Sequence, residues 1–183
     1  SPKDIAAIAA KVHARSFYGI IQSDLTFSGI EIALWDLLGK VKEEPIYKLL
    51  GYKKAEKKLP YASVLFGDSP EETYQKASTM KNNGFSAIKF GWGPFGLSAV
   101  KKDADHIFAA REGIGKSGYL MIDAGTVFGQ DLKAAGQRLK ALKEAKVTWY
   151  EEPVAAAAIS LYKKLSNMKP HVPLAGGEGA HNT

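Results

Sequence analysis

Apolar residues near the start of the chain recur with the spacing of helices. Residues 3–16 place isoleucine, alanine and valine on one face, and residues 28–39 carry a broader apolar stripe. Ser28 and Glu31 stand three residues apart at the head of that stripe, which is the pattern of a capping box. These segments predict a separate helical unit over residues 1–52.

From about residue 53 the pattern changes, and short apolar runs alternate with helical segments. Strands are expected at 59–66, 86–90, 119–123, 147–151 and 172–175, with helices between them. Repeats of this kind, with right-handed crossovers, build a parallel sheet, either a barrel or a doubly wound sheet. Residues 53–183 are therefore predicted to form an α/β domain. Five strands do not close an eight-stranded barrel, so we expect the chain to be a fragment.

Three apolar segments, each containing all or part of a predicted strand, end in a carboxylate, at Asp123, Glu151 and Glu178. The first two lie 28 residues apart and the last two 27 apart, which is about one strand and one helix with their loops. Parallel strands bring such ends together, and clustered carboxylates need a shared proton or a cation among them. Ligands that are all oxygen suit a hard divalent ion, above all Mg²⁺.

Each of these motifs has a plainer interpretation when it is taken alone. Asp123 could form an Asx-turn before Gly125, and an exposed Glu151-Glu152-Pro153 could cap a loop. The two companions at matching spacing favour the metal site over those interpretations.

Composition narrows the class of protein. No run of 18 apolar residues occurs and the start of the chain lacks a signal-peptide pattern, so no membrane association is expected. The absence of cysteine excludes disulfides and thiolate chemistry and fits a reducing, cytoplasmic setting. The net charge of +6 is spread over helices. Lys133, Lys140, Lys143 and Lys146 are expected on a solvated face; a nucleic-acid-binding stripe is the minor alternative, because no aromatic residues are interleaved.

The order of these motifs resembles the mandelate racemase/muconate lactonizing enzyme family of the enolase superfamily. The run from Ser28-Gly29-Ile30-Glu31 to Gly39-Lys40 is similar to the helical part of that family's capping domain. Ile122-Asp123-Ala124, Glu151-Glu152-Pro153 and Gly177-Glu178 are similar to its three metal-binding strand ends. The resemblance implies an enolase-type (β/α)7β barrel, a homo-oligomer, and Mg²⁺ held by Asp123, Glu151 and Glu178. It also implies that the reaction begins by removing a proton α to a carboxylate, with the enediolate stabilised on the metal.

The family often carries a Lys-x-Lys pair at the end of the second barrel strand, and the matching positions here are Lys89 and Gly91. Strand alternation puts Ala87, Lys89 and Gly91 on one face, which suits the barrel interior. The resemblance implies that Lys89 contacts the substrate carboxylate. In the family the second lysine acts as a base on one face of the substrate, so glycine at position 91 argues against racemisation by two bases. The plainer alternative is a solvated lysine at a strand end.

The family's opposing acid or base is often a His–Asp pair on strands six and seven, which are not in this chain. His181 follows Glu178 by three residues and is a candidate proton donor, although a lone histidine at a rim can equally be a bystander. Trp92 and Phe95, in the glycine-rich turn after Lys89, are expected to line the pocket.

Taken with the resemblance, these features predict a metal-dependent lyase that dehydrates a sugar acid. Lys89 and His181 are the expected catalytic residues, and Asp123, Glu151 and Glu178 the expected Mg²⁺ ligands. The alternatives are a racemase, epimerase or cycloisomerase acting on a carboxylate substrate, and a non-catalytic structural homologue. The expected partner is a small-molecule carboxylate, and neither nucleic acid nor a membrane is expected.

Overall fold

The chain forms two compact units, Ser1–Lys58 and Leu59–Thr183. The computed structural model describes residues 4–5, 7–11 and 22–178, and the described residues of the predicted helix 3–16 are helical. None of the helices in this described part has the length and apolar character needed to cross a membrane.

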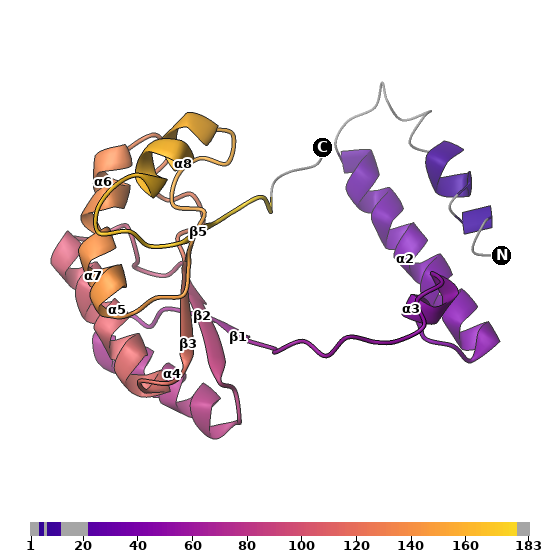
Figure 1. Ribbon diagram of the computed structural model, residues 1–183, viewed down its shortest axis with the longest axis horizontal. Coiled ribbons are helices and arrows are strands. Elements are labelled where there is room, and N and C mark those ends of the chain that lie inside the picture. The colour runs from indigo at the N-terminus through magenta and orange to yellow at the C-terminus, as the bar shows by residue number, and fades with distance from the viewer. Residues whose placement is uncertain (1–3, 6, 12–21, 179–183) are drawn as a thin grey trace. The chain divides into compact units, whose positions relative to one another are not determined.

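The first unit contains a long helix, α2 (Gln22–Lys42), followed by the short α3 (Ile46–Leu49) (Figure 1). The predicted helix start at Ser28 is wrong, because α2 begins six residues earlier and passes through Ser28 and Gly29. No proline interrupts this stretch, and a glycine inside a helix costs only about 1 kcal/mol relative to alanine. The stripe of apolar residues therefore continues a helix that had already begun.

The second unit is a five-stranded parallel sheet with helices between successive strands (Figure 1). In spatial order the strands are β1 (Ala62–Leu65), β2 (Ala87–Gly91), β3 (Tyr119–Asp123), β4 (Tyr150–Glu151) and β5 (Leu174–Ala175). The helices are α4 (Pro70–Asn82), α5 (Val100–Ile114), α6 (Leu132–Gln137), α7 (Leu139–Glu144) and α8 (Ile159–Ser166). Spatial order follows chain order without the reversal of a doubly wound sheet, so the barrel arrangement is favoured.

The bounds of β1, of β4 and of the helix after β3 differ from the prediction, and β1 covers only Ala62–Leu65 of the expected 59–66. Regular pairing of β4 covers only Tyr150 and Glu151, although the Thr148 N–H still donates to the Leu120 carbonyl at 2.7 Å. The predicted helix 131–146 is interrupted at Arg138. The buried Arg138 guanidinium pairs with Asp103 at 2.8 Å and also donates a hydrogen bond to the Ala134 carbonyl. The side chain of Arg138 thus occupies the carbonyl that the backbone N–H at this position would use in a regular helix.

The core lies between the sheet and its helices, α4 and α5 among them (Figure 1). Ile88 and Phe90 of β2 belong to this core, whereas Lys89 between them points to the opposite face, as strand alternation requires. Phe95 is 2% exposed and stacks on Phe66 with ring centroids 5.2 Å apart. The expectation that Phe95 lines a pocket is therefore wrong, because its ring closes the core beneath the turn.

Candidate metal centre

The carboxyl ends of β2, β3 and β4 lie side by side. The backbone register pairs Gly91 with Asp123, Asp123 with Glu151, and Glu151 with Ala175. Because the strands are parallel, this register stands Asp123 and Glu151 at one level on the same edge of the sheet. The structure thus brings together two of the carboxylates that the spacing of the motifs singled out.

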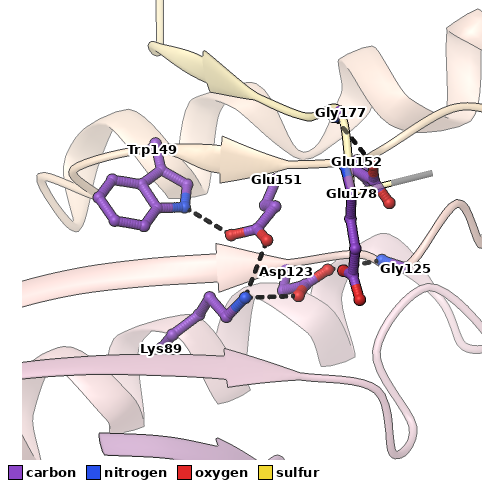
Figure 2. Close-up of polar contacts among 8 residues, drawn as sticks. All are labelled: Lys89, Asp123, Gly125, Trp149, Glu151, Glu152, Gly177 and Glu178. Atoms are coloured by element: carbon purple, nitrogen blue, oxygen red, sulfur yellow. Dashed lines mark hydrogen bonds and ion pairs between the residues drawn. The ribbon is translucent and has the colours of Figure 1, made fainter. Parts of the chain in front are cut away.

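Lys89 reaches both carboxylates from β2 (Figure 2). Its Nζ is 2.8 Å from Glu151 Oε1 and 3.0 Å from Asp123 Oδ2, and its side chain is 10% exposed. Burial alone would lower the pKa of Lys89, but the hydrogen bond to Glu151 and the pairing with Asp123 outweigh burial and raise the pKa above its ordinary value. Lys89 is therefore an inward-pointing, protonated cation rather than a solvated lysine.

The two oxygens of Asp123 have different surroundings. Oδ1 accepts a hydrogen bond from the Gly125 N–H at 2.9 Å, which is the Asx-turn considered from the sequence. Oδ2 is buried and has no hydrogen-bond partner among the described residues, although Lys89 Nζ pairs with it ionically. The turn and a ligand role are compatible, since the turn uses one oxygen and leaves the other directed into the site.

Glu151 also uses both oxygens. Oε1 meets Lys89, and Oε2 accepts a hydrogen bond from the indole Nε1 of Trp149 at 2.8 Å (Figure 2). Reasoning from the sequence did not identify Trp149 as part of the site. The available signal was its position two residues before Glu151, which in an extended segment puts both side chains on the same side of the chain.

Glu152 holds the end of β5 rather than joining the cluster. Its Oε1 accepts the backbone N–H groups of Gly177 and Glu178, both at 3.1 Å. The backbone at Glu152 adopts φ 39°, in the left-handed region, immediately before Pro153. Glu178 is exposed, and Figure 2 shows its side chain extending from this end of the chain toward Asp123.

A finished three-carboxylate site is not formed in the part of the chain that the structure describes. No group of three or more His, Cys, Asp or Glu side chains there is arranged to hold a metal ion. Ligation of one ion by Asp123, Glu151 and Glu178 therefore stays a prediction. His181 lies outside the described residues, so its placement near this rim is also still a prediction.

The donor set nevertheless fits a hard divalent cation. Asp123, Glu151 and Glu178 offer only carboxylate oxygens, which Mg²⁺ prefers. Asp123 Oδ2 is buried, and Lys89 Nζ at 3.0 Å is its ionic partner, so this oxygen and Glu151 Oε1 are directed at the same cation. Two neighbouring carboxylates also require a compensating positive charge, and the single charge of Lys89 leaves their cluster net negative.

Trp92 stands beside the Asp123 turn and is 52% exposed. Its backbone adopts φ 50°, which is uncommon for a residue with a side chain. Gly125 has φ 52°, and a Cβ atom there would come within 2.6 Å of Trp92 Nε1. Glycine at position 125 therefore permits the indole to lie against the backbone next to Asp123.

Comparison with known proteins finds matches to one protein family in both units of the chain. Residues 3–51 match the model of the mandelate racemase/muconate lactonizing enzyme N-terminal domain, and residues 72–183, more than half of the chain, match the enolase C-terminal domain-like model. The chain is 29% identical to arabinonate dehydratase from Saccharolobus solfataricus and 35% identical to D-galactarolactone cycloisomerase from Agrobacterium fabrum. Each match covers 84% of this chain and 40% of the relative.

Solved structures agree. A predicted mandelate racemase from Rhodobacter sphaeroides superposes with a TM-score of 0.87 at 49% identity, covering 100% of this chain and 46% of its own. D-glucarate dehydratase from Agrobacterium tumefaciens, solved with magnesium, gives a TM-score of 0.66 at 32% identity, covering 78% of this chain and 38% of its own. The chain therefore belongs to the mandelate racemase/muconate lactonizing enzyme family of the enolase superfamily, and its sheet is part of that family's β/α barrel.

Proposed function

We propose that the protein containing this chain is a Mg²⁺-dependent lyase that dehydrates a sugar acid. Asp123, Glu151 and Glu178 hold the ion, which when bound supplies a Lewis acid for negative charge developing on the substrate carboxylate. The oxygen-only donor set supports this assignment, as does the magnesium in the D-glucarate dehydratase neighbour. The observation that carries the proposal is Lys89 between Asp123 and Glu151, with glycine at position 91.

Lys89 binds the substrate carboxylate in this proposal. Its ammonium group is already desolvated and protonated at the strand ends. With Asp123 and Glu151 engaged as metal ligands, the Lys89 ammonium would be available for a charge-assisted hydrogen bond to a third carboxylate, that of the substrate. Such a bond orients the α-carbon for proton removal and draws electron density toward the carboxylate oxygens.

Gly91 favours elimination over racemisation. A Cβ at this position would come within 3.2 Å of the Asp123 Cβ and carbonyl oxygen, so a side chain here would crowd a candidate ligand. Racemisation by two opposed bases would therefore lack a base at this position, whereas elimination needs only one. In the elimination a base takes the α-proton, an acid protonates the departing β-hydroxyl to water, and the enol product tautomerises to a keto acid. His181 is the candidate acid, and the base is assigned to a part of the barrel beyond this chain.

A cycloisomerase or racemase is the second candidate, because the relative at 35% identity is a cycloisomerase and the structure at 49% identity is described as a predicted mandelate racemase.

Incubating the full-length protein with Mg²⁺ and a library of sugar acids in deuterated water separates the two reactions. A dehydratase should yield a keto acid lacking one water, with no deuterium in recovered substrate when proton removal is effectively irreversible. Interconversion of stereoisomers, or ring formation without loss of water, would replace the dehydratase assignment. Absence of any turnover across the library would favour a non-catalytic homologue.

The remaining expectations concern the intact molecule, and we propose them as well. Residues 1–52 would form the helical part of a capping domain, and the barrel would be completed by further strands in a homo-oligomer. Intact mass spectrometry combined with light scattering of the native protein tests both points. A native monomer of 183 residues would contradict them.

A further inference from the structure

We infer that Trp149 is a positioning residue for the metal centre: its indole N–H fixes the carboxylate of Glu151 so that Oε1 faces the site. The inference rests on the proposed metal site and adds a residue that does not itself touch the ion or the substrate. It is independent of whether the reaction is dehydration or isomerisation, since either would need the same ligand orientation.

The contacts of Glu151 carry the inference. Trp149 Nε1 donates to Oε2 at 2.8 Å, while Lys89 Nζ donates to Oε1, also at 2.8 Å (Figure 2). The terminal torsion of a glutamate is otherwise broad, so a free carboxylate would present either oxygen in many orientations. Donors on opposite oxygens fix the plane of the group. The carboxylate that would hold a cation is therefore already oriented by these two donors.

Trp149 is itself held in place. Its ring packs edge-on against Tyr61, with centroids 6.2 Å apart and planes at 81°. The Tyr61 ring also lies beneath Lys89, with Nζ 5.6 Å from its centroid. One tyrosine thus contacts both residues that donate to Glu151, and the four side chains form a connected layer below the strand ends.

Packing alone does not require a tryptophan at this position, because phenylalanine could also present a ring to Tyr61. Tryptophan differs from phenylalanine in carrying an indole N–H, which acts only as a hydrogen-bond donor. In the structure this N–H donates to Glu151 Oε2. Partners that orient metal ligands in this way typically contribute about ten- to a hundredfold to metal affinity. The expected effect of losing the N–H therefore lies in metal binding rather than in folding.

The test is Trp149→Phe in the full-length protein, with Mg²⁺ affinity measured by calorimetry and Mn²⁺ affinity by electron paramagnetic resonance. We expect both ions to bind about ten- to a hundredfold more weakly, with the melting temperature in EDTA close to that of the parent. Tyr61→Leu is the matched control, since it removes the ring contact and keeps the donor, and it should weaken metal binding much less. Equal losses in the two variants, or unchanged affinity in Trp149→Phe, would overturn the inference.

A second variant covers the case in which Trp149→Phe fails to fold. Site-specific replacement of Trp149 by benzothienylalanine keeps the bicyclic shape and lacks the N–H, so it should weaken metal binding by a similar factor. A parent-like affinity in that protein would also overturn the inference. If the parent protein binds neither ion, the proposed metal site and this inference fail together; if the parent binds and Trp149→Phe binds equally well, only the inference fails.

Discussion

Lys89 is the residue on which the proposed chemistry depends most directly. It compensates Asp123 and Glu151 at 3.0 and 2.8 Å in the structure, and it is proposed to hold the substrate carboxylate during turnover. In the proposal these two roles would follow one another, because Asp123 and Glu151 acting as metal ligands would no longer need the ammonium as their counter-charge. Lys89 would thus act first as the counter-ion of two carboxylates and then as a binding group for the substrate carboxylate.

For Lys89→Ala in the full-length protein, we predict a strong loss of turnover with metal binding nearly intact. Losing a charge-assisted bond to a carboxylate in a closed site should cost about 1.5–3 kcal/mol, or roughly one to two decades in rate. Steady-state kinetics and Mg²⁺ calorimetry on one preparation measure both quantities. The exposed Lys140→Ala is the control and should change neither. Full activity in Lys89→Ala would show that the lysine serves only to balance charge.

Among the elements, the loop after β4 governs the position of β5. Glu152 is buried and accepts the backbone N–H groups of Gly177 and Glu178, which follow β5. Glu152→Ala should destabilise the protein by about 1.5–3 kcal/mol, the usual contribution of a hydrogen bond to a charged group, and should weaken Mg²⁺ binding through Glu178. Glu152→Gln keeps an acceptor oxygen and should lose less. Urea unfolding and Mg²⁺ titration of the two variants make the comparison, and equal losses would contradict the hydrogen-bonding role.

A second link joins the loop after β1 to helices α4 and α5. Thr73 Oγ1 accepts the Gly67 N–H at 3.0 Å and lies 2.8 Å from His106 Nδ1. Burial lowers the pKa of His106 below its ordinary value, although Asp103 and Asp105 oppose the shift. The unfolded chain therefore binds the proton more readily than the folded one.

Stability from this link should be fully present above the unfolded-state pKa of about 6.5 and should decline as the pH falls below it. We predict that the melting temperature drops more steeply between pH 7 and 5 in the parent than in His106→Gln. Other titrating groups are shared by the two proteins, so the difference reports His106. Parallel curves would contradict a buried, neutral histidine.

For the molecule as a whole, we expect Mg²⁺ binding to increase the free energy of unfolding. An ion that binds only the folded state stabilises it by about 2.7 kcal/mol when present at a hundred times its dissociation constant. We predict that EDTA lowers the melting temperature and abolishes turnover, and that Mg²⁺ restores both. Asp123→Asn should remove the Mg²⁺-dependent increment, whereas the exposed Glu144→Gln should keep it. An unchanged melting temperature in EDTA would argue against a structural contribution from the metal.

Local and periodic features were predictable from the chain alone. The alternation of strands and helices, the cap of Ser69 on α4, and the inward direction of Lys89 follow from side-chain periodicity and short-range hydrogen bonds. The separation of Asp123 and Glu151 by one β/α repeat predicted that they lie side by side, because successive parallel strands end at one level. Such features depend on neighbours in sequence or on a regular repeat.

Features that depend on contacts between distant segments were decided by the tertiary structure. The break at Arg138 escaped prediction because local propensity is weak beside a buried partner such as Asp103. The burial of Phe95 and the hydrogen bond from Trp149 to Glu151 also required the packed sheet. Periodicity tells which face a side chain occupies, but only packing selects which atom it touches, since burial makes each unsatisfied polar group costly and each ring contact favourable.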